Sequence, residues 1–307
     1  MAGRIVSHIV WSLHDGYDNL RRSPLLESQV MPELPEVETV CRGLEPELTG
    51  RMLTGVTLRR SNLRYPLPDG FVAKLTSRRV IAVRRRAKFI LVQLDNEITL
   101  VIHLGMSGRL VIHTESPPPP PGPHDHVDVV TDTGVTIRYN DVRRFGFMDL
   151  ISDADMSQHP MFAKLGPEPL GNGFNAEMLC ETLAGRRTSI KAALLDQHVV
   201  AGLGNIYVCE SLFRASISPK RNAYTIAGRR AERLVTAIRA VLKDAIAAGG
   251  SSLRDYVQAS GELGYFQHKF QAYDQEGKPC VMPGCKGTVR RISQSGRSTF
   301  YCPGHQR

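Results

Sequence analysis

The sequence of 307 residues lacks any hydrophobic run close to the roughly 20 apolar residues that a membrane-spanning helix needs. It contains a single tryptophan, Trp11, which lies within the first thirty residues. Those thirty residues lack the apolar centre of a secretory signal, and their three acidic residues argue against a transit peptide. Apolar residues recur with regular spacing over most of the chain, which excludes disorder as the main state. The length fits one large or two moderate domains, each with its own core.

Acidic residues are missing from the last thirty residues, whereas six basic residues are present there. The whole chain has 39 Lys and Arg against 30 Asp and Glu, a formal net charge of +9, and residues 1–30 contribute none of it. Two thirds of the net charge therefore lie in the tail. Such a concentrated basic patch indicates a polyanionic partner, with nucleic acid the first candidate, and the alternative is a solvated, solubilising surface.

Cysteine is scarce, and the spacing of the six cysteines divides them into two groups. The first three lie in apolar, helical contexts that are typical of buried small side chains. Near the C-terminus, Cys280 and Cys285 enclose a tight loop, and Cys302 and His305 follow after a spacer of sixteen residues. Two such pairs around a hairpin-length spacer predict a zinc ribbon with these four ligands, in which the metal supplies the folding energy. A disulfide with one free thiol is the alternative.

The pattern of apolar residues changes along the chain. From about residue 50 to 150, short apolar runs alternate with turn signals, which is typical of an antiparallel β-sandwich or barrel. From about residue 175 the spacing becomes helical, and residues 231–248 place their apolar side chains on one face. Near the start, Pro35 and the glutamates around it predict a helix that begins just after Pro32 and Glu33. The sequence therefore predicts an α+β, multidomain protein.

The segment Met31-Pro-Glu-Leu-Pro-Glu-Val-Glu38 resembles the N-terminus of the bacterial formamidopyrimidine-DNA glycosylases (Fpg, or MutM), which repair oxidised purines. The resemblance spans residues 31–307 in order. Leu34 favours this purine-directed branch over the endonuclease VIII-type relatives, which prefer oxidised pyrimidines and usually have glycine there. Further matching motifs are Arg85-Arg-Ala-Lys-Phe89, His103-Leu-Gly-Met-Ser-Gly108, His124-Asp-His-Val-Asp128, Arg143-Arg-Phe-Gly146, Leu165-Gly-Pro-Glu-Pro-Leu170, Gly202-Leu-Gly-Asn-Ile-Tyr207 and Gly296-Arg-Ser-Thr-Phe-Tyr-Cys302.

The resemblance implies three folded parts after an extension, residues 1–30, that we do not expect in the mature protein. These are an N-terminal antiparallel β-sandwich with a flanking helix (31–160), a helical helix-two-turn-helix domain (161–275) and the zinc ribbon (276–307). It implies a bifunctional base-excision repair enzyme that removes 8-oxoguanine and formamidopyrimidines and nicks the abasic strand by β,δ-elimination. We expect a monomer of the bacterial cytosol with one structural Zn²⁺, double-stranded DNA containing oxidised bases as its partner, and no membrane association.

The resemblance also assigns the catalytic residues. Pro32, as an N-terminal secondary amine, would attack the sugar C1′ and form a Schiff base, while Glu33 would protonate the sugar ring oxygen. Lys88 would be the proton donor in β-elimination and Arg297 the one in δ-elimination. Glu36 would support the site. From local sequence alone, Lys88 in its run of arginines is more typical of a solvated surface lysine.

The target base of such an enzyme must leave the duplex, and protein side chains must fill the gap. The resemblance places Met106, Arg143 and Phe145 in this role, although local sequence also fits a Met and a Phe in the β core. Further positions that match the family's DNA contacts are His124, Arg186, Asn205 and, as a plausible addition, Lys191. A mobile segment near Ser251–Gln267, with Gly261 and Gly264, would cap the lesion.

Two departures from the family pattern matter. The first cysteine pair is more widely spaced than usual, and His305 stands where the family has its last cysteine. More seriously, Met31 is internal, and a proline within a chain has an amide nitrogen that cannot form a Schiff base. Either translation begins at Met31, which we favour, or residues 1–30 are removed, or the polypeptide as written is not catalytic. The alternatives for the function are a pyrimidine-directed glycosylase and a non-catalytic protein that binds DNA lesions.

Overall fold

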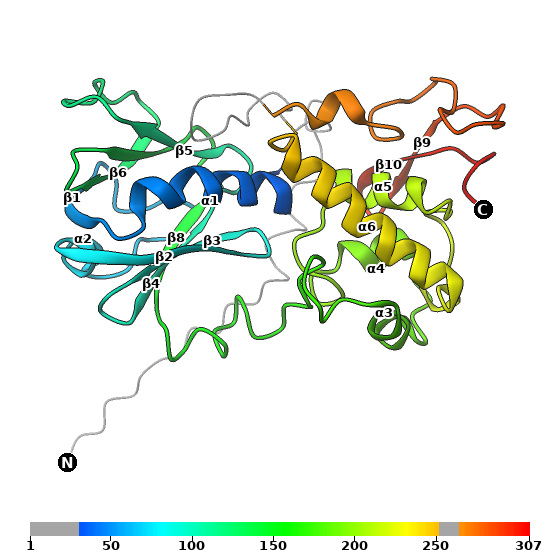
Figure 1. Cartoon of the computed structure of the whole chain (residues 1–307), viewed down its shortest axis with the longest axis horizontal. Helices are drawn as coiled ribbons and strands as arrows, with labels where there is room; N and C mark the ends of the chain where they lie inside the picture. The colour runs from blue at the N-terminus through cyan, green and yellow to red at the C-terminus, as the bar shows by residue number, and fades with distance from the viewer. Residues whose placement is uncertain (1–30, 252–263) are drawn as a thin grey trace, which may run out of the picture.

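The structure, a computed structural model, describes residues 31–251 and 264–307. Figure 1 shows two halves side by side: strands crossed by the helix α1 (Leu34–Leu48), and helices that end in a small hairpin. The predicted extension, residues 1–30, lies outside the described residues, as does most of the predicted capping segment, including Gly261. No helix in the described ranges is long and apolar enough to cross a membrane.

The N-terminal half is built on one antiparallel sheet of eight strands in the order β5-β7-β6-β1-β2-β3-β4-β8. β1 pairs with β6 from Leu53 to Leu58, but with β2 only through Met52 and Leu53, so two four-stranded halves meet at a short seam. Both halves and α1 bury side chains in one core, which confirms the predicted antiparallel domain with its helix. The elements are β1 (Met52–Leu58), α2 (Phe71–Leu75), β2 (Arg78–Arg86), β3 (Phe89–Leu94), β4 (Ile98–His103), β5 (Gly108–His113), β6 (Asp125–Thr131), β7 (Thr136–Asp141) and β8 (Phe147–Ser152).

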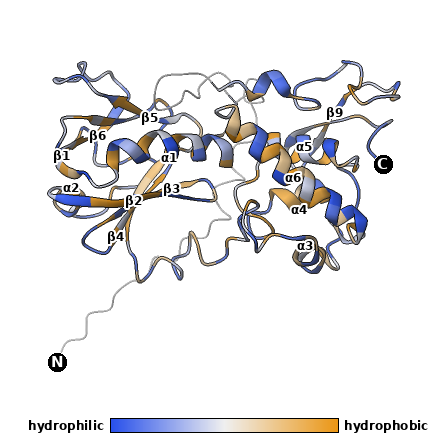
Figure 2. Cartoon of the chain, in the orientation of Figure 1, coloured by the Kyte–Doolittle hydropathy of each residue, from blue (hydrophilic) through white to orange (hydrophobic). Residues whose placement is uncertain are grey.

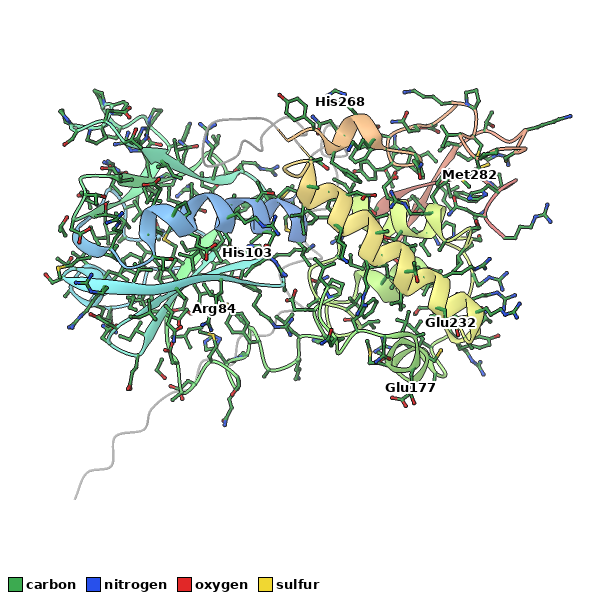
Figure 3. The ribbon with its side chains drawn as sticks, in the orientation of Figure 1. Arg84, His103, Glu177, Glu232, His268 and Met282 are labelled. Atoms are coloured by element: carbon green, nitrogen blue, oxygen red, sulfur yellow. The ribbon has the colours of Figure 1, made fainter. Side chains whose placement is uncertain are left out.

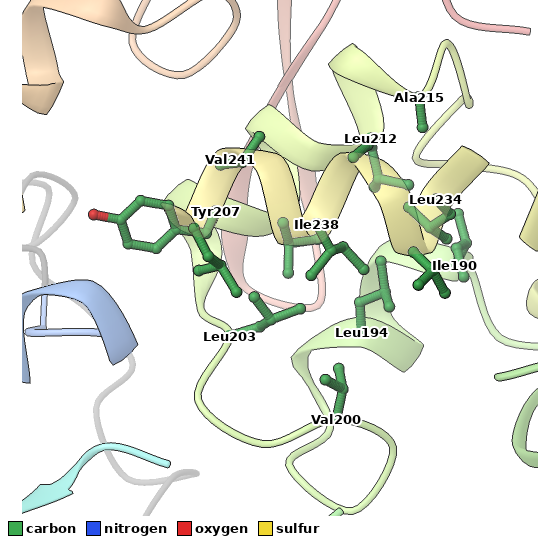
Figure 4. Close-up of a cluster of buried hydrophobic side chains, with 14 of the residues drawn as sticks. Ile190, Leu194, Val200, Leu203, Tyr207, Leu212, Ala215, Leu234, Ile238 and Val241 are labelled. Atoms are coloured by element: carbon green, nitrogen blue, oxygen red, sulfur yellow. The ribbon is translucent and has the colours of Figure 1, made fainter. Parts of the chain in front are cut away.

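The C-terminal half packs its helices around α6 (Arg229–Ala247), whose predicted apolar face is fully buried. Figure 2 shows hydrophobic and hydrophilic stretches alternating along α6, as expected for a helix with one buried face. Figure 4 shows that face meeting Leu194 and Leu203, while the Tyr207 hydroxyl points out of the cluster towards α1. The other helices are α3 (Ala176–Leu183), α4 (Ile190–Leu195), α5 (Asn205–Arg214), and the short η2 (Ala223–Thr225) and η3 (Phe266–Lys269).

The C-terminal hairpin consists of β9 (Arg290–Gln294) and β10 (Arg297–Tyr301), which pair antiparallel around Ser295 and Gly296 as predicted. Glu210 of α5 anchors the segment leading to it, because the buried Glu210 carboxylate accepts hydrogen bonds from three successive backbone N–H groups. The donors are Gln271, Ala272 and Tyr273, at 3.0, 2.9 and 2.7 Å. The position of the hairpin is therefore tied to α5.

Candidate active site

The N-terminus of α1 lies against the N-terminus of α5. The Glu33 backbone N–H donates to the Glu36 carboxylate at 2.9 Å, which closes the first turn of α1. The Leu34 N–H donates to the Gly202 carbonyl at 3.1 Å, so the chain entering α1 is docked on the loop that precedes α5. Pro32 and Glu33, both buried, are consequently placed where the two halves of the molecule meet.

Glu33 points its carboxylate at the positive end of α5. One Glu33 oxygen accepts from the Ile206 N–H at 3.0 Å, and the other is buried without a hydrogen-bond partner in the described part of the chain. Burial raises the pKa of the Glu33 carboxyl above its ordinary value, while the charge of Lys88 and the backbone N–H groups of α5 oppose the rise. A raised pKa makes a carboxyl group better suited to act as a general acid near neutral pH.

Two glycines make this approach possible. A Cβ atom at Gly204 would lie 2.3 Å from the Glu33 Cδ, and one at Gly202 would lie 2.7 Å from the Leu34 Cδ1. Gly202 also has φ of +86°, in the left-handed region that favours glycine. The Gly-Leu-Gly-Asn motif of the sequence is therefore explained by the space that the α1 N-terminus occupies.

We expect Gly204→Ala to reduce base excision by about 100-fold, because a displacement of about 1 Å at a reacting group has that order of effect. The backbone at Gly204 has φ of −136°, which alanine adopts freely, so the effect comes from the contact with Glu33 alone. Single-turnover excision measures it, with thermal melting as the check on folding. Gly173→Ala is the control, since its nearest neighbour would lie at 3.9 Å. Equal rates for both variants would contradict the steric explanation.

Lys88 and Arg297 bring positive charge to the same place from two other elements. Lys88 lies in the β2–β3 turn, is only 7% exposed, and makes no hydrogen bond or ion pair within the described residues. Burial lowers the pKa of the Lys88 ammonium; the charges of Glu33 and Glu36 oppose this, and the charge of Arg297 adds to it. Half-buried Arg297 begins β10. We call Pro32, Glu33, Lys88 and Arg297 the four-residue cluster, since α1, the β2–β3 turn and the hairpin bring them together.

The β2–β3 turn that carries Lys88 is held by Glu168, a residue that the local sequence does not mark as part of a site. The Glu168 carboxylate accepts from the Ala87 N–H at 2.6 Å and pairs with Arg85 and Arg86 at 2.7 and 2.8 Å. Ala87 has φ of +52°, an uncommon conformation for alanine that needs such support. The Leu165-Gly-Pro-Glu motif between the two halves thus fixes the position of Lys88.

Glu36 forms a second buried carboxylate site next to Glu33. It accepts a short hydrogen bond from the Tyr207 hydroxyl and one from the Ser251 N–H at 2.8 Å. Burial, and then the charge of Glu33, raise the pKa of Glu36 from 4.5 to about 7. Tyr207 belongs to a motif noted in the sequence, but its partner lies 171 positions away, so no local signal indicated this contact.

This pKa makes the folding stability depend on pH. The folded protein holds the Glu36 proton more tightly than the unfolded chain, so this stabilisation is complete below about pH 4.5 and is lost as the pH rises through 7. The loss amounts to about 3 kcal/mol in the free energy of unfolding. We expect Glu36→Gln to flatten the decline between about pH 5 and 8 in urea unfolding, and Glu45→Gln, at an exposed position of the same helix, to leave it unchanged. A decline that persists in Glu36→Gln would assign the pH dependence to another group.

The residues expected to fill the gap in DNA lie on two loops that touch. The Arg143 guanidinium lies 4.6 Å from the centre of the Phe145 ring, and both side chains are half-buried. A Cβ at Gly105 would be 2.3 Å from the Phe145 carbonyl carbon, so the loop of Met106 packs directly on the loop of Phe145. His124 is exposed. These four residues therefore belong to one continuous region.

The other expected DNA contacts are engaged within the protein. Arg186 pairs with Asp196 at 3.0 Å, and Asn205 donates to the Ser298 carbonyl at 2.9 Å. Lys191 differs from the expectation: it is 0% exposed, and its ammonium donates to the Ser298 carbonyl and to the Thr299 hydroxyl at 2.9 and 2.6 Å. A fully buried ammonium cannot reach a phosphate, so Lys191 here positions β10 next to Arg297.

His103, in a motif noted for its resemblance, has a packing role that the sequence did not show. Its ring stacks on Phe147 with centroids 5.2 Å apart, and its Nδ1 accepts from the Gly105 N–H at 3.1 Å. Burial and the charges of Lys88 and Arg64 lower the pKa of His103 to about 3. The neutral ring of His103 is a rigid, uncharged neighbour of Lys88. Figure 3 labels His103 in the N-terminal half.

Three cysteines of the predicted ribbon converge. The Sγ atoms of Cys280, Cys285 and Cys302 all lie within 4.8 Å of one another, with Cys285 and Cys302 3.7 Å apart. Thiolates at about 2.3 Å from a tetrahedral Zn²⁺ are about 3.8 Å apart, so the cysteines fit this metal. His305 is outside the group: its Nε2 lies 2.9 Å from the Phe213 carbonyl oxygen, which leaves Nδ1 as the free ring nitrogen.

Comparisons with known proteins identify the family to which the chain belongs. The family model of the formamidopyrimidine-DNA glycosylase N-terminal domain matches residues 31–148, and that of the H2TH domain matches residues 165–257. Curated formamidopyrimidine-DNA glycosylases of Rhodospirillum centenum and Dinoroseobacter shibae are 62% and 56% identical, over 90% of this chain and 100% of each relative.

Solved structures agree as well. The MutM (Fpg) protein of Thermus thermophilus is 39% identical with a TM-score of 0.78, over 90% of this chain and 98% of that one. A mutant of Lactococcus lactis Fpg, in complex with DNA containing Fapy-dG, is 32% identical with a TM-score of 0.82, over 90% and 100%. With both halves matched and relatives at this identity, the chain belongs to the formamidopyrimidine-DNA glycosylase family.

Proposed function

We propose that this protein is a base-excision repair enzyme that excises oxidised purines, 8-oxoguanine and formamidopyrimidines, and then nicks the abasic strand by β,δ-elimination. The observation that carries this proposal is the four-residue cluster. It combines a buried carboxyl with a raised pKa, a buried ammonium with a lowered pKa and an arginine, all beside Pro32. The names of the family model and of the relatives support the substrate class.

The chemistry assigns one role to each member of the cluster. The Pro32 nitrogen forms a bond to the sugar C1′ while the bond from C1′ to the base breaks, and the departing base takes up the proton that the Pro32 nitrogen releases. Glu33 transfers its proton to the ring oxygen as the C1′–O4′ bond breaks and the iminium forms. The iminium acidifies the C2′ hydrogen, so that its proton is lost to water while the bond to the 3′ phosphate breaks, with Lys88 as proton donor to this leaving group. In a second elimination the C4′ proton is lost to water while the bond to the 5′ phosphate breaks, with Arg297 as proton donor.

This mechanism requires a free secondary amine at Pro32. An amide nitrogen has no basic lone pair, so we propose that Pro32 is the N-terminal residue of the active protein. The match of the family model from residue 31 onwards supports this start, as does the coverage of whole relatives by 90% of this chain.

We further propose that Cys280, Cys285, Cys302 and the Nδ1 of His305 hold one structural Zn²⁺, which when bound fixes the hairpin.

Double-stranded DNA would contact His124, Arg143, Arg186 and Asn205, and Met106 and Phe145 would enter the space of the flipped base. Arg186 would then exchange Asp196 for a phosphate. We propose a monomer acting in the cytosol.

Borohydride trapping on an 8-oxoguanine duplex tests the proposal. A covalent adduct whose linkage maps to Pro32 by peptide sequencing is expected, together with faster cleavage of 8-oxoguanine than of thymine-glycol duplexes. The opposite preference would support the pyrimidine-directed alternative. Damage-selective binding without any adduct, from a protein shown by mass spectrometry to start at Pro32, would support a non-catalytic lesion binder.

A further inference from the structure

The carboxylate of Asp141 lies at the base of both loops that carry the expected gap-filling side chains. Asp141 is 0% exposed and is the last residue of β7. One of its oxygens accepts from the Ser107 hydroxyl at 2.5 Å, and the other from the Gly146 N–H at 2.9 Å and the Tyr139 hydroxyl at 3.1 Å. Within the described residues it has no ion-pair partner, so these three donors replace its hydration.

Ser107 completes the connection between the loops. Its hydroxyl donates to Asp141 and also accepts from the Arg143 N–H at 3.0 Å, so Arg143 is held by its backbone. Met106 precedes Ser107 in one loop, and Phe145 precedes Gly146 in the other. The Asp141 N–H also donates to the His124 carbonyl at 3.0 Å. Every DNA-facing residue proposed for the N-terminal half is therefore attached to Asp141, directly or through its neighbour.

The backbone between these attachment points is strained. Arg144 has φ of +55°, in the left-handed region that is unfavourable for residues with side chains. Such a conformation persists only where the surrounding structure enforces it. The bonds from Arg143 to Ser107 and from Gly146 to Asp141 stand on either side of Arg144, so the Asp141–Ser107 pair is what enforces it.

The two loops also pack closely around the hydroxyl of Tyr139. A Cβ at Gly146 would lie 1.9 Å from the Tyr139 hydroxyl oxygen, and one at Gly108 would lie 2.7 Å from the same atom. Tyr139 itself is 1% exposed. The hydroxyl of Tyr139 therefore fills the space between the loops, and its hydrogen bond to Asp141 fixes it there.

We propose that Asp141 and Ser107 are positioning residues that hold Met106, Arg143 and Phe145 as one preformed wedge. The wedge enters the duplex without rearrangement. No free energy is then needed to order its loops while the base is flipped out. Because the Arg143 backbone is fixed, its side chain always approaches the orphaned base from the same position. The Asp141–Ser107 pair therefore helps to determine which base is preferred opposite the lesion. This inference rests on the proposed function, since it assumes that these side chains fill the gap.

Ser107→Ala tests the inference, with Thr99→Val as matched control. Thr99 makes the same kind of buried hydroxyl–carboxylate bond, to Asp153 at 2.6 Å, but four residues before His103 at the far end of β4. Stopped-flow fluorescence of 2-aminopurine next to 8-oxoguanine follows base unstacking, and single-turnover excision opposite cytosine and opposite adenine follows discrimination. Loss of the Ser107 hydroxyl, which removes its bonds to Asp141 and to the Arg143 N–H, is expected to slow unstacking about tenfold and to lower the cytosine-to-adenine ratio several-fold.

Borohydride trapping on single-stranded abasic DNA separates the two proposals, because a single strand has no gap to fill. Ser107→Ala is expected to trap like the wild type there, and an absent wild-type adduct on an abasic duplex would overturn the proposed function. A wild-type adduct together with equal unstacking and discrimination in Ser107→Ala and Thr99→Val would overturn the wedge. If Ser107→Ala does not fold by thermal melting, Asp141→Asn is measured by the same two readouts, with a smaller loss in the same direction expected.

Discussion

Replacing Glu33 with glutamine is expected to lower base excision by about 10²- to 10⁴-fold, the usual contribution of a general acid. Glutamine is isosteric and keeps an oxygen to accept from the Ile206 N–H, so the docking of α1 on α5 survives. It has no acidic proton for the sugar ring oxygen. A pre-formed abasic site has no base to expel and is in equilibrium with its ring-opened aldehyde, so its nicking depends less on protonation of the ring oxygen, and we expect it to remain within about tenfold of the wild type. Single-turnover assays on 8-oxoguanine and abasic duplexes measure the two steps separately.

The pH profile provides a second readout for the same residue. Excision by the wild type should fall as the pH rises above the raised pKa of Glu33, because the acid form is lost, and the residual rate of Glu33→Gln should lack this limb. Glu177→Gln is the control. Glu177 also lies in the first turn of a helix, α3, but is exposed and points away from the molecule in Figure 3. Parallel loss of excision and nicking in Glu33→Gln would indicate a misplaced Pro32 instead.

Replacing Cys302 with serine is expected to remove the metal and, with it, at least about 100-fold of the strand-nicking activity, because Arg297 loses its fixed position. Cys302 is 0% exposed and packs with Cys280 and Phe213, so the ribbon and α5 share a small core that a bound Zn²⁺ would stabilise. Structural zinc contributes about 10–16 kcal/mol of binding energy to small domains. Metal content by mass spectrometry and nicking of an abasic duplex are the measurements.

Cys180→Ser is the control for cysteine loss, since Cys180 is a half-buried residue of α3 outside the cluster. It should keep both metal and activity. His305→Ala tests whether His305 is the fourth ligand. Loss of the metal would show that it is, and full retention would show that the three cysteines bind the ion with another group. Full nicking by a metal-free Cys302→Ser would contradict the dependence of Arg297 on the ribbon.

Elements with a strong local signal were predictable from the sequence. The buried face of α6, the start of α1 after Glu33, the turn at Ser295 and Gly296 and the grouping of three cysteines all follow from short-range patterns. In each case the determining residues lie within about one helical turn or one hairpin of each other, so spacing alone is sufficient.

The supporting contacts could not be predicted because they join distant positions. Glu33 and Ile206 are 173 residues apart, and Lys88 lies in a turn fixed by Glu168 from the linker between the halves. The local sequence predicted a surface position for Lys88, because nothing in it shows that the preceding arginines form ion pairs with carboxylates. Lys191 shows the converse: a lysine expected at DNA is buried under β10.

Helix α5 has an evolutionary consequence. Its residues from Ile206 to Phe213 are all buried, and the helix contacts the acid residues of α1 at one end and His305 at the other. Substitutions that alter lesion preference can accumulate in loops, where they shift one side chain at a time. A substitution in α5 would disturb its contacts with Glu33 and Glu36 at one end and with His305 at the other. We therefore expect the sequence of α5 to stay almost unchanged while the substrate preference of related proteins changes. This helix should then be the segment in which distant ancestry can be recognised longest.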